Sequence, residues 1–129
     1  MAFKRFIRVS FASLAMFSLI ACENSAQLSI VQKSPGAVQI IVNRDNGRPS
    51  CVYGLSISHT VNGKIYTDWN IYLNDERIKK CVSNFYYPSL PPEYDLTQKA
   101  IPLVAGKAYD VSIVGVGFSA NGSFVSKAR

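Results

Sequence analysis

Alternation of apolar and polar residues is the feature that most constrains the fold of this chain. Apolar side chains recur at every second position in residues 38–42, 53–57, 65–71 and 109–113. This spacing places one set of side chains on the core face of a strand and the other set toward solvent. Beyond residue 22 no convincing helical stripe occurs, and residues 74–80 could form one charged turn at most. The chain is therefore predicted to be all-β.

Turn residues divide these segments into strands. Asn62-Gly63 predicts a hairpin between residues 52–60 and 64–73, and Asn121-Gly122 predicts a second hairpin before a last strand near Phe124. The alternation shifts near Gly115 and Gly117, which predicts a bulge there. The expected fold is a small antiparallel β-sandwich of six to seven strands, immunoglobulin- or transthyretin-like.

A tyrosine- and proline-rich segment, residues 86–102, interrupts the strand pattern. Its prolines cannot donate ladder hydrogen bonds, so it is predicted to be a long crossover or a sheet edge. Tyrosine is enriched at protein interfaces. One interpretation is therefore a partner-binding surface formed by Tyr86, Tyr87, Pro91, Pro92 and Tyr94. The alternative is that alternate aromatic side chains fold inward to cap the sandwich while the prolines stiffen the crossover.

The N-terminus has the layout of a secretory signal. Lys4, Arg5 and Arg8 are followed by an uncharged, largely apolar run over residues 9–21. A helix that spans a bilayer needs about 20 apolar residues, and this run is shorter. An uncleaved membrane anchor is the less favoured alternative, because Glu23, Asn24 and Ser25 end the run at once.

The end of this run, Leu19-Ile20-Ala21-Cys22, resembles the lipobox of bacterial lipoproteins. The resemblance implies cleavage before Cys22 and attachment of lipid to its thiol, and several acyl chains hold a protein to a membrane far better than one. Glu23 resembles the outer-membrane sorting pattern. We therefore expect a signal peptide at 1–21, a lipidated tether at 22–36, and a sandwich domain at 37–129 in the bacterial cell envelope, facing the periplasm, with membrane contact through the lipid.

Charge and cysteine content fit such an exported domain. Loss of the signal lowers the formal net charge from +6 to about +3, which is too mild and too scattered to indicate nucleic-acid binding. Of the three cysteines, Cys51 and Cys81 remain after Cys22 is lipidated. In an oxidising periplasm this pair is predicted to form a disulfide. Two buried free thiols are the alternative.

No catalytic, metal or cofactor motif is evident. The single histidine, His59, lies at a predicted strand end and is expected to be an exposed surface residue. Asp68, Glu93, Asp95 and Asp110 lack a catalytic motif, and we expect solvated carboxylates. The chain is accordingly predicted not to be an enzyme, to hold no cofactor or metal, and to take no small-molecule substrate.

The order of features after Cys22 resembles small periplasmic lipoproteins proposed as type VI secretion immunity proteins. The matching residues are Cys51-Val52, Cys81, the prolines of 88–92, Gly106-Lys107-Ala108-Tyr109-Asp110-Val111, and Phe124. The resemblance implies a protein that binds and neutralises a toxin in the periplasm, and it implies no catalytic residues.

A narrower resemblance links residues 42–50 to an early segment of the type VI secretion assembly lipoprotein that has a transthyretin-like sandwich. The chain departs from that family after this segment, where Cys51-Val52-Tyr53-Gly54-Leu55 stands. The sequence thus leaves two predicted functions. The first is a lipid-tethered module that captures a protein partner such as a toxin. The alternative is a structural lipoprotein subunit of an envelope or secretion assembly.

Overall fold

The fold is an antiparallel β-sandwich, as the alternation predicts. A computed structural model describes residues 26–44, 50–74 and 81–127. These residues form eight strands and no helix: β1 (Ala26–Ser34), β2 (Ala37–Arg44), β3 (Val52–Val61), β4 (Lys64–Leu73), β5 (Asn84–Tyr87), β6 (Tyr94–Gln98), β7 (Ala108–Gly115) and β8 (Phe118–Val125). None of the described residues forms a helix long and apolar enough to cross a membrane.

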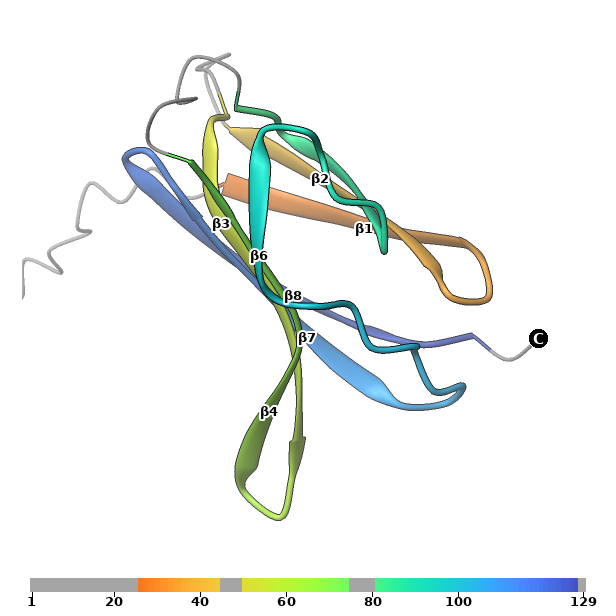
Figure 1. Cartoon of the computed structure of the whole chain (residues 1–129). Coiled ribbons are helices and arrows are strands. Elements are labelled where there is room, and N and C mark those ends of the chain that lie inside the picture. Colours follow the sequence, from red (N-terminus) through yellow and green to blue (C-terminus); the bar gives the residue numbers. More distant parts are fainter. Residues whose placement is uncertain (1–25, 45–49, 75–80, 128–129) are drawn as a thin grey trace, which may run out of the picture.

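The strands form two layers (Figure 1). One sheet has three strands in the order β1-β2-β5, and the other has five in the order β6-β4-β3-β7-β8. The eight strands exceed the predicted six to seven because β1 and β6 lie in segments expected mainly as a tether and a crossover. Ala26–Ser34, within the range expected as a tether, pairs antiparallel with β2 as β1, and β6 lies in the proline-rich segment. β1 thus adds an edge strand to the small sheet.

The core lies between the layers and contains the aliphatic and aromatic side chains that the alternation places inward. Both sheets contribute fully buried residues, and their largest members are Trp69, Tyr94, Tyr109, Phe85, Ile40, Leu55, Ile57 and Ile71. Burial of each large apolar side chain stabilises the fold by about 1.5–3 kcal/mol before entropic losses. Tyr53 does not follow the predicted parity and is exposed, because a register shift between Val52 and Gly54 turns it outward.

The last hairpin is not where the sequence predicted it. The chain turns at Val116-Gly117 between β7 and β8, with Gly117 at φ 80°, so the expected bulge is this turn. Asn121-Gly122 lies inside β8, opposite Ser112 and Val111. Gly122 serves a different purpose there: a Cβ at this position would lie 2.9 Å from Ile30 of β1, so a glycine allows the two sheets to approach closely.

The proline-rich segment connects the two sheets, as predicted for a crossover. It leaves β5, an edge strand of the small sheet, and enters β6, an edge strand of the large sheet. β5 itself begins at Asn84, just before this segment. Both edge positions suit prolines, since an edge strand needs fewer ladder donors.

Candidate functional site

The β3–β4 hairpin extends beyond the sandwich as a two-stranded arm (Figure 1). The pairing of β3 with β7 ends at Ser58, and the pairing of β4 with β6 ends at Asn70. The ladder partners of residues 59–67 therefore all lie within the β3–β4 hairpin; we call this segment the arm. It ends in the predicted Asn62-Gly63 turn, where positive φ values of 51° and 77° match a type I′ hairpin.

A β-bulge at the root of the arm sets the direction of its side chains. Ile57 pairs with Trp69, whereas Ser58 pairs with Thr67, so Asp68 is the extra residue on β4. Bulges of this kind turn side chains toward new faces. Asp68 is buried, while Ile65 and Thr67, which the alternation placed in the core, are exposed. The prediction of core positions at 65 and 67 was wrong for this reason.

The buried carboxylate of Asp68 is paired with the only histidine of the chain. His59 Nδ1 lies 2.6 Å from Asp68 Oδ2, and the two side chains are 14% and 5% exposed. The Nδ1–H donates to the carboxylate in the neutral tautomer, and a charged pair forms if the ring is protonated. Both residues were expected at the solvated surface, so this prediction was wrong: tertiary packing encloses them.

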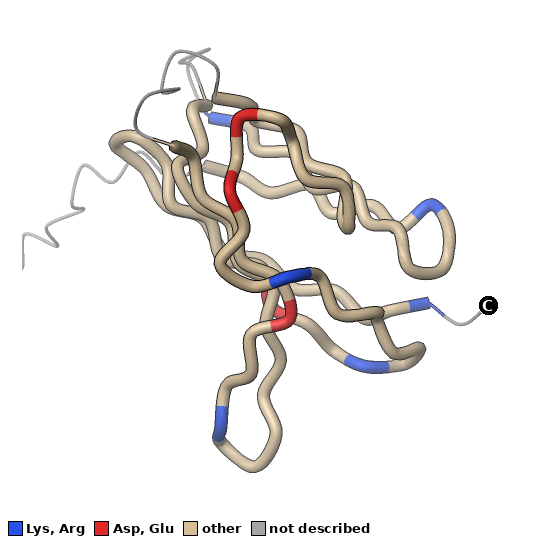
Figure 2. The backbone as a smooth tube through the Cα atoms, in the orientation of Figure 1, with Lys and Arg blue, Asp and Glu red and all other residues tan. Residues whose placement is uncertain are grey.

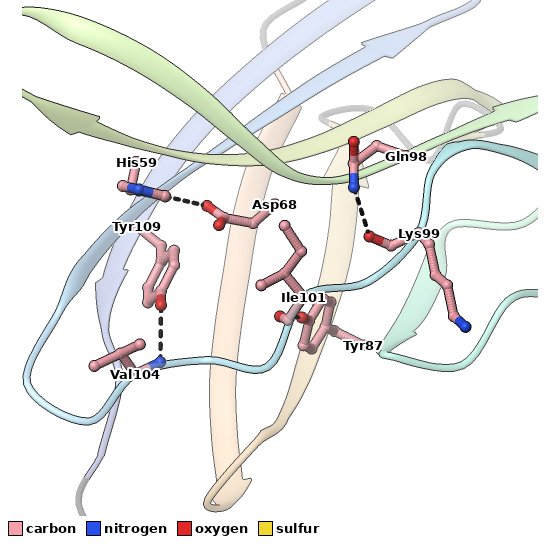
Figure 3. A network of polar contacts seen from close by, with 8 residues as sticks. All are labelled: His59, Asp68, Tyr87, Gln98, Lys99, Ile101, Val104 and Tyr109. Carbon is pink, nitrogen blue, oxygen red and sulfur yellow. Dashed lines mark hydrogen bonds and ion pairs between the residues drawn. The ribbon is translucent and has the colours of Figure 1, made fainter.

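Aromatic contacts complete the root of the arm (Figure 3). The His59 ring stacks on Tyr66 at a centroid distance of 5.4 Å and meets Tyr109 edge-on at 6.0 Å. The Tyr109 hydroxyl accepts a 2.8 Å hydrogen bond from the Val104 backbone N–H. The Ile101 N–H donates to the backbone oxygen of Asp68. The root of the arm is therefore held to β7 through Tyr109 and to the segment before β7 through the backbone of Asp68.

Beyond this root the arm carries exposed apolar side chains. Ile65 is 70% exposed, Val61 45% and Tyr66 44%. Ile65 and Tyr66 are neighbours on one strand and so point to opposite faces of the ribbon. The Lys64 ammonium lies 5.3 Å from the centre of the Tyr66 ring, and residues 59–67 contain no carboxylate. The arm thus presents apolar surface on both faces together with one cation.

The described contacts of the His59–Asp68 pair are those of a structural pair. An imidazole held by a carboxylate can serve as a general base when a nucleophile lies within reach. The contacts described for His59 are to Asp68 and to two aromatic rings. No group of three metal-ligating side chains occurs within the described ranges. Positioning of the arm is the role that the geometry of this pair supports.

The structure separates the residues of the predicted tyrosine surface. Tyr87 and Tyr94 are buried, at 2% and 1% exposure, whereas Tyr86 is 52% exposed on the edge strand β5. Pro92 is exposed and Pro91 is half-buried. Tyr87 of β5 and Tyr94 of β6 point inward and fill the core. Only Tyr86 and the prolines of this set are therefore accessible to a partner.

The two buried tyrosines have structural partners. The Tyr94 hydroxyl donates to the backbone oxygen of Val52 at 2.6 Å and accepts from the backbone N–H of Val82 at 3.1 Å. The Tyr87 hydroxyl donates to the backbone oxygen of Ile101. Burial, followed by the charge of Asp68 and the phenol of Tyr109, raises the pKa of Tyr87 to about 12. Burial also raises the pKa of Tyr94.

Cys51 and Cys81 form a disulfide in the structure, in agreement with the predicted pairing, with their Cα atoms 5.2 Å apart. Cys51 precedes β3 of the large sheet and Cys81 precedes β5 of the small sheet. The bridge therefore ties the two layers together. Cys22, the predicted lipid-attachment residue, lies outside the described residues.

The sequence pattern does not reveal the arm, because its alternation continues that of the buried half of the hairpin. The signal that could have located it is the run of exposed-type residues around Asn62-Gly63 in a hairpin longer than its neighbouring strands.

The chain matches no protein-family model and no curated protein sequence.

Proposed function

We propose that this chain is a lipid-anchored periplasmic protein that binds a protein toxin through the arm and blocks it, as an immunity protein does. The observation that carries the proposal is the projecting ribbon with Val61, Ile65 and Tyr66 exposed. A flat binding surface needs apolar side chains on one face only. Apolar side chains on both faces suit insertion into a cleft, where each face contacts one wall.

The charge of the arm indicates which kind of partner cleft would bind it. Lys64 is its one formally charged residue at neutral pH when His59 is neutral. A cleft with apolar walls and an acidic rim would complement it, since opposite potentials guide association and orient the partners. The catalytic clefts of glycoside hydrolases, which hold a pair of carboxylic side chains, are one example of an acidic cleft.

The proposed anchor would hold the sandwich close to its membrane. If lipid is attached at Cys22, β1 begins only four positions later, at Ala26. Four extended residues reach at most about 14 Å, so the stand-off is much shorter than a tether ending at residue 36 would give. In Figure 1 the arm tip lies at the other end of the molecule from the start of β1. This placement would present the arm to periplasmic proteins.

A growth assay tests the proposal. Candidate toxins encoded beside the gene for this chain are exported to the periplasm of a sensitive bacterium with and without co-expression of the full chain. We expect the chain to restore growth, and Ile65→Asp to abolish the restoration. Val114→Asp is the matched control, because Val114 is also exposed, at 56%, but lies on β7 away from the arm. No restoration by the chain, or equal restoration by both variants, would contradict the proposal.

The second candidate function is a structural subunit of an envelope or secretion assembly. The observation that favours it is a set of exposed apolar side chains on β3, β4 and β7 of the large sheet: Tyr53, Tyr72 and Val114. In the register of the sheet, Tyr72 and Val114 flank Gly54 on either side. Stoichiometric co-purification with several envelope proteins, lost in Val114→Asp and retained in Ile65→Asp, would select this alternative.

A further inference from the structure

A cavity of about 550 Å³ opens between the two layers at the end of the sandwich where they diverge. Pro35 and Gly36, the turn between β1 and β2, form one side. The segment before β7 and the end of β8 form the other side, with Ala100, Leu103 and Ser126 among the lining residues. This volume falls within the range of about 300–1,000 Å³ that small-molecule sites occupy.

The walls of the cavity are apolar and offer few polar groups to an occupant. Prolines and alanines predominate, and the Tyr87 hydroxyl is already bonded to the Ile101 carbonyl. Ser126 is buried and lies within reach of the Gln32 side-chain amide. A peptide in this cavity would bring backbone N–H and C=O groups that these walls could not pair, at a cost of about 1–3 kcal/mol for each buried unpaired group. An aliphatic chain brings no such groups.

The rim of the cavity is basic. Lys127 lines it directly, with its ammonium 3.2 Å from the Gln32 carbonyl. Lys33, Lys99 and Lys107 lie within two residues of the lining residues Pro35, Ala100 and Ala105. Figure 2 shows Lys and Arg positions on both sides of the gap between the layers. Lys107 also lies 5.9 Å from the Tyr109 ring centre. Of the six described lysines and arginines, Lys127 thus lines the cavity and three more lie within two residues of its lining residues.

The described carboxylates do not neutralise this rim. Asp68 is paired with His59, and the Asn74 side-chain amide donates to Asp95. Asp110 is exposed on β7, opposite Ser58 and Ser123. Glu93 adjoins Tyr94, at the start of β6. None of the four described carboxylates is among the cavity-lining residues, so an anionic head group at the mouth would meet the positive charge of Lys127.

We infer that this cavity binds an anionic amphiphile, with a single aliphatic chain between the layers and a carboxylate or phosphate head at the lysine rim. This goes beyond the proposed toxin binding and departs from the expectation that the chain takes no small molecule. The cavity lies at the far end of β1 from Ala26, and a strand of nine residues spans about 30 Å. With an anchor at Cys22, the mouth would face away from the membrane, so we expect the ligand to arrive from the aqueous side.

The single tryptophan provides a probe of occupancy. Trp69 packs edge-on against Tyr87 at 5.2 Å, and Tyr87 lines the cavity. The full chain is reconstituted in phosphatidylcholine vesicles and titrated with decanoate below its micelle concentration, while Trp69 fluorescence is recorded. We expect a saturable change with decanoate and at least tenfold weaker binding of decanol, which shares the chain but lacks the charge.

Variants separate this site from non-specific partition into the vesicles. Ala105→Phe should fill the cavity and remove the saturable change, and circular dichroism should show that the variant is folded. Lys127→Gln should weaken decanoate binding about fivefold, as expected for the loss of one partly exposed charge contact. Lys64→Gln, a matched lysine substitution on the arm, should leave the affinity unchanged.

The source of the head group is tested in the same system. A Trp69 change on adding phosphatidylglycerol to the vesicles, without decanoate, would identify a membrane phospholipid as the ligand. A change with decanoate alone would identify a free fatty acid. Equal responses to decanoate and decanol, or an unchanged response in a folded Ala105→Phe variant, would overturn the inference. Because none of these readouts involves a toxin, failure here is distinguishable from failure of the proposed function.

Discussion

The two halves of the β3–β4 hairpin differ sharply although they belong to the same pair of strands. In the root half, Leu55, Ile57 and Trp69 are buried and both strands have further neighbours in the sheet. In the arm, residues 59–67 have ladder partners only within this hairpin, and Ile65 is 70% exposed. An isolated two-stranded ribbon is marginally stable on its own. The root therefore maintains the fold, while the arm is the part that is available for contact.

The largest expected effect contrasts one aromatic residue from each half. Trp69→Ala should lower the free energy of unfolding by about 3–5 kcal/mol, because it removes a fully buried side chain from the core. Tyr66→Ala, in the arm, should cost about 1 kcal/mol or less, since Tyr66 is 44% exposed. Urea unfolding of both variants measures the difference. Similar losses would show that the arm is part of the folding core.

Loss of the disulfide should destabilise the root of the hairpin and leave the arm unchanged. Replacement of both Cys51 and Cys81 by Ala should lower the free energy of unfolding by about 3–4 kcal/mol, as the chain-entropy model gives for a separation of 30 residues. Unfolding in urea, with and without reductant, measures this loss in the unmodified chain. At a temperature where the variant stays folded, hydrogen exchange of residues 59–67 should be unchanged; faster exchange there would tie the arm to the bridge.

Alkaline pH should weaken the packing of the small sheet on the root through Tyr87. An unfolded tyrosine ionises near pH 10, whereas the pKa of buried Tyr87 is raised to about 12. The fold favours the neutral phenol, so this stabilisation is complete below pH 10 and is lost as the pH rises toward 12. The loss is about 2–3 kcal/mol. Tyr87→Phe should lack this step in urea titrations at pH 9–12; an equal decline in both proteins would contradict the assignment.

The last of the predicted effects concerns the junction of the two halves. Asp68→Asn keeps the size of the side chain but removes the charge opposite His59, and should cost about 1–2 kcal/mol. The same change should weaken toxin neutralisation, because the arm would lose part of its support. Asp110→Asn, an exposed carboxylate on β7, is the control. If the two variants behave alike in unfolding and in the growth assay, the pair does not position the arm.

Local patterns predicted the strands that alternate cleanly, the Asn62-Gly63 turn and the pairing of Cys51 with Cys81. Other features depend on contacts that one segment cannot reveal. Gly122 has the sequence context of a turn glycine, yet it accommodates Ile30 from another sheet. β1 contains Gln32 and Ser34 among its apolar residues, so its sequence also fits a polar tether and does not reveal the pairing with β2.

The candidate site shows the same limit more strongly. The direction of the side chains of the arm depends on the bulge at Asp68, which reverses the parity of the strand within one residue. Whether a carboxylate at that point faces solvent or His59 is decided by the packing of Tyr109 and the segment before β7, far along the chain. A period-two pattern in the sequence does not reveal such a shift in register, and so Ile65 was expected to be buried.

Site-specific crosslinking in living cells tests most directly whether the arm is the contact surface. A photoreactive residue is placed at position 65, in the arm, or at position 114, on the sheet, of the full chain co-expressed with the neutralised toxin. The account predicts an adduct with the toxin from position 65 and none from position 114. An adduct from position 114 alone, or none from position 65 while growth is still restored, would contradict it.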